Sequence, residues 1–255
     1  AIVIATGSTR PRDLDVPGRS LSGVHFAMEY LRRQNLELEG ALERPRISAA
    51  GKHVIIIGGG DTGADCLGTA HRQRPASVRQ LEILPEPPED RADGNPWPTW
   101  PIVLRSSAAH EEGGERMYSI NTAELLGDDS GTVRAIRVHR VERNGATGAF
   151  EAVPGEDQEL SADLVLLALG FTGPEQGGVV ADLGLEIGPR GTIAVDQTYA
   201  TSRAGVFACG DAVRGQSLVV WAIAEGRSVA AAVDTYLVGR TELPVPLKAG
   251  TTALV

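Results

Sequence analysis

The sequence predicts an α/β fold in which a parallel sheet is joined by an antiparallel meander. Three apolar runs that end at or beside a glycine, residues 53–57, 163–170 and 206–211, are typical of parallel strands buried on both faces. Segments with helical character lie between them, and this alternation is the pattern of α/β folds. Alternating apolar and polar residues at 133–141, followed by renewed strand character at 150–153, predict the meander.

The composition is that of a globular protein without a basic surface. Of the 255 residues, 42% are hydrophobic and 22% charged, which is enough to bury a core. The 24 basic and 33 acidic residues leave a net charge of −9, which argues against binding to nucleic acid or to a membrane surface. The longest apolar run, residues 218–224, is far shorter than a membrane span. We therefore expect a cytoplasmic protein.

The first elements predict a chain that opens inside a sheet. Residues 1–5 are apolar and predict a buried strand ending at Thr6-Gly7. A loop over 9–23, a helix over 27–33 and a linker over 40–51 follow. Because the chain opens on a buried strand, we expect further sequence upstream of Ala1.

The clearest motif is a glycine loop between the strand at 53–57 and a predicted helix that runs to Arg74. Residues 58–63 satisfy G-x-G-x-x-G, and the following strand at 78–84 completes a unit of βαβ type. In such a loop Gly58 makes the tight turn, Gly60 lets the backbone approach a pyrophosphate, and Gly63 lets the helix pack closely on the strand. We expect Asp61 to cap the helix or to point toward the nicotinamide ribose.

The choice between NADH and NADPH stays open from these residues. Glu82 and Glu86, at the end of the second strand, favour a ribose 2′-hydroxyl and therefore NADH. Arg72, Arg74 and Arg91 are close enough in sequence to bind a 2′-phosphate instead.

A second pair of features predicts a flavin site. Thr6-Gly7 ends the first strand, and Gly210-Asp211 ends a late one. Gly210 would allow close approach, and Asp211 would accept a hydrogen bond from a ribityl or ribose hydroxyl. A helix beginning near residues 216–218 would aim its N–H groups at the pyrimidine side of the flavin ring.

Other residues carry weaker signals. Trp97 and Trp100 either flank the nicotinamide cleft or anchor the proline-rich loop at 90–101, and we favour anchoring. Residues 110–114 are either a solvated loop or a segment with a role near the nucleotide, and we favour the solvated loop. Cys66 and Cys209 lack a C-x-x-C partner and predict small buried residues, and the histidines show no metal-ligand spacing. Hydride transfer needs no side-chain acid or base, so we predict no catalytic residue and no metal.

These motifs, in this order, resemble the pyridine nucleotide–disulfide oxidoreductase superfamily. The segments at 58–62 and 216–226 are most similar to the family of glutamate synthase small (beta) subunits. The resemblance implies two Rossmann-like three-layer dinucleotide-binding domains, with an NAD(P)H domain inserted in a truncated FAD domain. The implied boundaries are an FAD domain at 1–48 and 172–255, and an NAD(P)H domain at 49–171.

The resemblance also implies cofactors, partners and contacts. NADPH passes hydride to FAD, iron–sulfur clusters upstream of Ala1 carry the electrons onward, and the glutamate synthase large (alpha) subunit receives them. The residues that match FAD contacts are Thr6, Gly7, Gly210, Asp211, Gln216, Ser217 and Leu218. The residues that match nucleotide contacts are Gly58, Gly60, Asp61, Thr62 and Gly63.

The chain departs from the family pattern in two places. It contains neither the cysteine-rich region nor the first FAD-binding strand and glycine loop, and residues 85–88 lack an arginine for the 2′-phosphate. Two alternatives remain. One is another NAD(P)H–FAD electron-transfer reductase, like ferredoxin–NADP reductase or dihydropyrimidine dehydrogenase. The other is a non-catalytic nucleotide-binding scaffold that docks a partner through its acidic surface.

Overall fold

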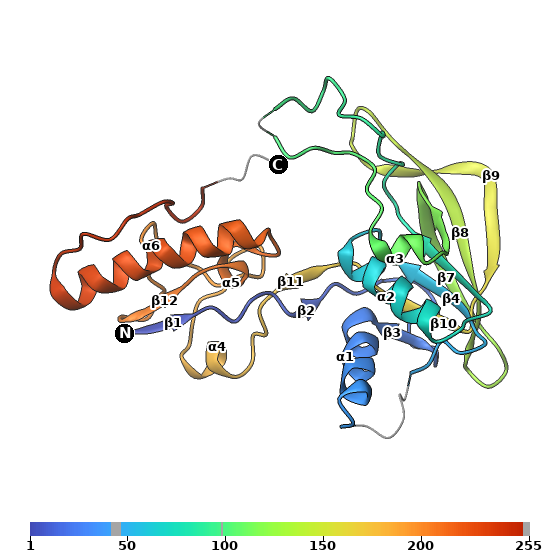
Figure 1. The fold of residues 1–255 in the computed structure, drawn as a ribbon, viewed down its shortest axis with the longest axis horizontal. Helices are drawn as coiled ribbons and strands as arrows, with labels where there is room; N and C mark the ends of the chain where they lie inside the picture. The colour runs from blue at the N-terminus through green and yellow to red at the C-terminus, as the bar shows by residue number, and fades with distance from the viewer. Residues whose placement is uncertain (42–46, 98, 252–255) are drawn as a thin grey trace. The chain divides into compact units, whose positions relative to one another are not determined.

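A computed structural model describes residues 1–41, 47–97 and 99–251, which form two compact units (Figure 1). Unit 1 comprises residues 1–12 and 170–255, and unit 2 comprises residues 13–169. Unit 2 is therefore inserted in the sequence of unit 1. Parts of the predicted linker at 40–51 and of the loop at 90–101 lie outside the described residues.

Unit 2 is built on a five-stranded parallel sheet in the order β3-β10-β4-β5-β6. Its strands are β3 (Val24–Phe26), β10 (Leu164–Leu167), β4 (His53–Ile57), β5 (Ser77–Leu81) and β6 (Glu115–Met117). The central strands β4 and β10 are almost wholly buried, as their unbroken apolar sequences predict. Strand β4 has the bounds that the sequence predicts.

Different layers cover the two faces of this sheet. One face packs against an antiparallel meander of β7 (Ile120–Gly127), β8 (Val133–Arg143) and β9 (Phe150–Ser161). The other packs against α1 (Ala27–Leu38) and α2 (Asp61–Arg72), which contact each other. A short helix, α3 (Ala108–Glu111), lies beside α2 (Figure 1). The result is the expected three-layer arrangement, with the glycine loop at the carboxyl end of β4.

Unit 1 has a smaller core around two parallel strands, β1 (Ile2–Ile4) and β12 (Val206–Ala208). The pair β2 (Arg10–Pro11) and β11 (Phe171–Gly173) is antiparallel. The helices of this unit are α4 (Val179–Asp182), α5 (Asp211–Arg214) and α6 (Val219–Val238). Helix α6 ends at Gly239, which takes the left-handed conformation common at helix ends.

The structure moves the first domain boundary. The sequence placed residues 13–48 with the FAD segments, and the compact units place them in unit 2. The physical reason is that β3 pairs with β10 and α1 packs on α2, so this segment completes the parallel sheet and one of its covering layers. The second boundary falls at 169/170 rather than 171/172.

No helix in the described part of the chain combines the length and the apolar character needed to cross a membrane.

Candidate functional site

The glycine loop leaves β4 in a conformation that requires glycine at its first position. Gly58 has φ +125°, and a Cβ there would lie 2.2 Å from the carbonyl oxygen of Ala168. Its N–H donates to Leu81 O at 2.8 Å, which ties the turn to the end of β5. A side chain at position 58 would therefore disrupt both the turn and its close approach to Ala168, the residue after β10.

The end of β5 holds the second residue of the loop. Glu82 Oε2 accepts the Gly59 N–H at 2.8 Å, and Glu82 Oε1 accepts the Leu84 N–H at 2.9 Å. The carboxylate of Glu82 thus supports the loop itself, a role that the sequence did not indicate.

Helix α2 begins directly behind the loop. Gly60 is its N-cap residue, with no side-chain capping bond, and Asp61 is already its first helical residue. The prediction that Asp61 caps the helix is therefore wrong, because the helix begins one residue earlier than that prediction required. Thr62 follows in the first turn. At Gly63 a Cβ would lie 2.3 Å from Gly58 O and 2.5 Å from Gln80 Nε2, so only glycine lets α2 approach the strands.

A cavity of about 380 Å³ opens at the N-terminus of α2. Gly60 and Asp61 line one end, and a Cβ on Gly60 would meet no atom within 4 Å. Tyr118 also lines the cavity, and its buried hydroxyl has no hydrogen-bond partner among the described residues. Free N–H groups at a helix N-terminus next to open space are suited to an anion such as a diphosphate.

The basic residues of this cavity are not those that the sequence indicated. Arg105 and Arg116 line it, and each also donates one hydrogen bond to a backbone carbonyl. Arg72 pairs with Glu112 instead, and Arg91 donates to two carbonyls of its own loop. Arg105 stacks on the Trp100 ring at 4.5 Å, and Arg116 lies over the Tyr118 ring at 5.3 Å. The sequence did not indicate these two arginines because a long irregular loop separates them from the glycine motif.

The two tryptophans of that loop differ from each other. Trp97 is 83% exposed and does not pack as a buried anchor, so the anchoring prediction is wrong for this residue. Trp100 lines the cavity beneath Arg105. The side chain of Asn95 holds the loop instead. Its Nδ2 donates to Thr99 Oγ1 and to Trp100 O, and its Oδ1 accepts the Ile102 N–H.

In unit 1 the two predicted flavin features meet at one end of a parallel pair. Because Ile4 is in register with Ala208, the segments Thr6-Gly7 and Gly210-Asp211 leave β1 and β12 on the same side. Gly7 and Gly210 both have positive φ, +78° and +66°. A Cβ on Gly7 would meet no atom within 4 Å, so its surroundings are open.

The remaining predicted flavin residues are linked around this end of the sheet. Ser217 Oγ donates to Asp211 Oδ1 at 2.9 Å. Gln216 Oε1 accepts the Phe171 N–H at 3.2 Å. Leu218 is the N-cap of α6, so the helix begins slightly later than the sequence indicated. The side chain of Leu218 is 41% exposed.

A buried ion pair behind Gly210 was not predicted. Glu225, in α6, is 1% exposed and accepts the Gly210 N–H at 2.8 Å. Its other oxygen accepts Arg214 Nε–H at 2.8 Å, and the Arg214 guanidinium lies over the Trp221 ring at 4.7 Å. The usable signal was an acid placed directly after the apolar run at 218–224.

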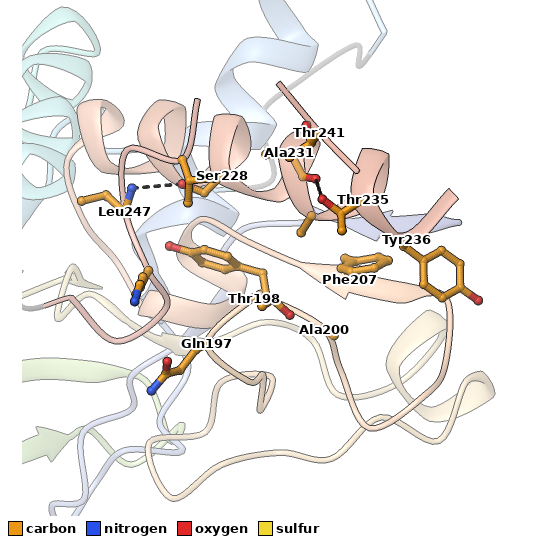
Figure 2. A pocket seen from close by; sticks show the side chains of 14 residues that line it. Gln197, Thr198, Ala200, Phe207, Ser228, Ala231, Thr235, Tyr236, Thr241 and Leu247 are labelled. Atoms are coloured by element: carbon orange, nitrogen blue, oxygen red, sulfur yellow. Dashed lines mark hydrogen bonds between the residues drawn. The ribbon is translucent and has the colours of Figure 1, made fainter. Parts of the chain in front are cut away.

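Unit 1 also contains an apolar cavity of about 460 Å³ between α6 and the chain on either side of it (Figure 2). Phe207 lies edge-on to Tyr236 with ring centroids 5.7 Å apart. Leu247 N–H donates to Ser228 Oγ at 3.0 Å, which holds the C-terminal segment on the helix.

The two cysteines are buried and free, as predicted. Burial raises the pKa of both thiols, with a further contribution from Asp65 at Cys66 and from Glu225 at Cys209. Within the described residues no cluster of His, Cys, Asp and Glu could hold a metal ion.

Two α/β units, one with a glycine loop at a helix N-terminus and both with glycines at the ends of parallel strands, define a two-domain dinucleotide-binding protein. The chain belongs to the pyridine nucleotide-disulphide oxidoreductase family, whose model matches residues 1–96 and 110–226.

Curated relatives extend beyond this chain. A protein named glutamate synthase (NADPH) small chain from Mycobacterium tuberculosis is 55% identical over 253 residues, which are 97% of this chain and 51% of that protein. The protein named glutamate synthase (NADH) from Saccharomyces cerevisiae is 46% identical, across 96% of this chain and 12% of its own length. The chain thus spans about half the length of the small-chain relative.

Solved structures share the fold. Mycobacterium tuberculosis FprA in complex with NADPH matches with a TM-score of 0.68 at 16% identity, covering 94% of this chain and 64% of that chain. Thioredoxin reductase of T. acidophilum matches with a TM-score of 0.58 at 22% identity, covering 93% and 65% respectively.

Proposed function

We propose that this chain is the FAD- and NAD(P)H-binding part of the electron-input subunit of a glutamate synthase. Unit 1 would hold FAD, and unit 2 would hold NADPH. The observation that carries the proposal is the pair of glycine cradles, one in each unit, at the carboxyl ends of parallel strands. The 55% identity to a protein named as a glutamate synthase small chain supports the choice of enzyme.

The residues at both cradles fit such ligands. In unit 2 the open space at Gly60 and the unpartnered Tyr118 hydroxyl leave room and a hydrogen-bonding group for a nucleotide. In unit 1 the space at Gly7 is open, and the buried hydroxyl of the adjacent Ser8 lacks a partner within the described ranges. Both unpartnered hydroxyls favour ligand binding, because buried polar groups are normally hydrogen-bonded.

The chain's own residues would bind and orient rather than react. When bound, a flavin supplies hydride acceptance from a reduced nicotinamide and onward electron transfer. Gly58, Gly60 and the N-terminus of α2 would hold the nucleotide diphosphate, while Asp211 would accept a hydrogen bond from a flavin hydroxyl. Because hydride transfer depends on proximity and orientation, no side-chain acid or base is assigned.

The proposal extends to NADPH as the preferred donor. Arg105 and Arg116 give the cavity two guanidinium groups, and guanidinium binds phosphate with two parallel hydrogen bonds. Glu82 also lines the cavity, and its two oxygens accept the Gly59 and Leu84 N–H groups, which hold the carboxylate against the glycine loop. The iron–sulfur clusters and the large subunit that would take up the electrons belong to the proposed whole enzyme.

Anaerobic titration of the full-length protein with NADPH tests this function. The expected result is a bound flavin whose visible absorbance bleaches on addition of NADPH. Purified protein that contains flavin but keeps its absorbance would favour the scaffold alternative. Protein that binds no flavin under any condition would exclude both reductase interpretations.

A further inference from the structure

We propose that His110 and Gln80 are positioning residues that hold the glycine loop of unit 2 in its nucleotide-binding shape through a chain of hydrogen bonds. This inference rests on the proposed function of unit 2. Neither residue is part of the G-x-G-x-x-G motif, and His110 lies where the sequence predicted a solvated loop.

The chain begins at Gln80, a polar residue that is 2% exposed on strand β5, between β4 and β6. Side chains alternate along a strand, so Gln80 shares the helix-covered face with Val78. Its Nε2 donates to Gly58 O at 2.9 Å. Together with the bond from Gly58 N–H to Leu81 O, this fixes both polar groups of Gly58 on β5.

The next member is His110 in α3, whose Nε2 lies 2.9 Å from Gln80 Oε1. The direction of this bond can be worked out from the other ring nitrogen. His110 Nδ1 lies 3.2 Å from the backbone N–H of Ser107, which can only donate. Nδ1 therefore accepts, and the proton of the neutral ring is on Nε2, which donates to Gln80.

The resulting order is Ser107 N–H to His110, His110 to Gln80, and Gln80 to Gly58 O. Each amide and ring atom has the donor or acceptor role that its neighbour requires. The chain joins the N-terminus of α3, which lines the cavity, to the first turn of the glycine loop.

The neutral imidazole satisfies every bond of this chain. A proton on Nδ1 would face the Ser107 N–H and would have to be donated to Ser107 Oγ, 3.0 Å away, so protonation would replace the bond from the Ser107 N–H and loosen one half of the capping box of α3. Burial and the nearby Arg116 both lower the pKa of His110, which is consistent with a neutral ring. The charged groups around His110 are Glu111 on its own helix, the Glu112–Arg72 pair, Arg116 on β6, and Asp61, Glu82 and Arg105 along the cavity.

Coenzyme binding should therefore weaken in acid, because His110 becomes protonated. We measure the dissociation constant of NADP⁺ with the full-length protein from pH 8 to pH 5.5. His110→Ala should raise it roughly 3–10-fold at pH 8, as expected for loss of a hydrogen bond of ordinary strength. His110→Gln, which keeps a neutral donor and acceptor, should restore part of the affinity. The dissociation constant of the wild type divided by that of His110→Gln should rise as the pH falls. Titration of the coenzyme affects both constants equally and therefore does not change this ratio.

A double-mutant cycle tests the chain as a unit. Gln80→Leu should weaken NADP⁺ binding to the same extent as His110→Ala, and the double variant should be no weaker than either single variant. His139→Ala is the matched control, since His139 lies in the meander of the same unit, bonded to Asn121. It should leave binding unchanged.

The outcomes separate the inference from the proposed function. Wild-type protein that binds NADP⁺ while the His110 and Gln80 variants bind equally well would overturn the inference and leave the function standing. Strictly additive losses, or a ratio that does not change with pH, would also overturn it. Wild-type protein that binds no NADP⁺ would overturn both.

Discussion

The carboxylate of Glu225 accepts the backbone N–H of Gly210 at 2.8 Å from within the core of unit 1. This bond joins the middle of α6 to the turn that carries Asp211. Since Arg214 shares the same carboxylate, one buried acid organises the two ends of α5. The predicted flavin site therefore depends on a residue that would not contact a flavin itself.

Replacing Glu225 should destabilise unit 1. Glu225→Ala leaves the Arg214 charge buried without its partner and removes the acceptor for Gly210, so we expect a loss of roughly 3–5 kcal/mol in the free energy of unfolding. Glu225→Gln keeps an acceptor and should cost less. Denaturant titration measures both. The exposed Glu242→Ala is the control, and an equal effect from it would contradict the account.

The first two glycines of the G-x-G-x-x-G motif should respond differently to alanine. Gly58→Ala places a Cβ 2.2 Å from Ala168 O at φ +125°, so it should lower stability by roughly 1–3 kcal/mol from the backbone strain alone, and more from the clash. Gly60→Ala meets nothing within 4 Å and should fold normally while binding NADP⁺ more weakly. Unfolding curves and NADP⁺ titrations of both variants check this. Equal stability losses would show that the loop is held differently.

Coenzyme preference should depend on the two arginines of the cavity. Arg105→Ala and Arg116→Ala should each reduce kcat/KM with NADPH about 10–100-fold more than with NADH, the effect of losing a hydrogen bond to a charged group. Arg134→Ala, at an exposed ion pair in the meander, is the control and should change neither value. The measurement is steady-state flavin reduction in the full-length protein. Parallel losses with both coenzymes would place the 2′-phosphate elsewhere.

The turn at Asp196 should contribute less to the stability of unit 1 in acid. Burial opposes ionisation of Asp196, but hydrogen bonds from Thr198 and Ala200 outweigh it and hold the pKa of this carboxyl below the usual 3.8. The unfolded chain therefore takes up the proton first as the pH falls. The stabilisation is complete above about pH 3.8 and is lost as the pH drops through the folded-state pKa.

Asp196→Asn should remove this component. The difference in unfolding free energy between wild type and variant should be constant near neutral pH and shrink below about pH 4. The turn also holds Tyr199 at φ +64°, so the variant should be less stable at neutral pH. A difference that grows in acid would contradict the prediction.

Local sequence was sufficient for much of this fold. Strand β4 is a β-branched run between polar residues and glycine, so its bounds follow from the sequence alone. Strand β3 was missed because three residues, Val24–Phe26, carry no period of their own and become a strand only by pairing with β10. The placement of residues 13–48 in unit 2 follows from the same pairing.

The site was predicted where its chemistry is contained in a short motif. The sequence pattern indicates Gly58, Gly63 and Gly210 because positive φ or close packing restricts the residue type at these positions. The bond between His110 and Gln80 was not predicted because the two residues are 30 apart in sequence. Arg105 and Arg116 were missed because they reach the cavity through a long loop. Contacts of this kind are set by tertiary packing, which no local pattern records.

One paired measurement tests the division of labour between the two units most directly. Asp211→Ala and Gly60→Ala are prepared in the full-length protein, and each is assayed for retained FAD and for the dissociation constant of NADP⁺. The account predicts that Asp211→Ala loses FAD and still binds NADP⁺, while Gly60→Ala keeps FAD and binds NADP⁺ weakly. The reverse pattern would contradict the account, because it would place FAD on unit 2 and the nicotinamide nucleotide on unit 1.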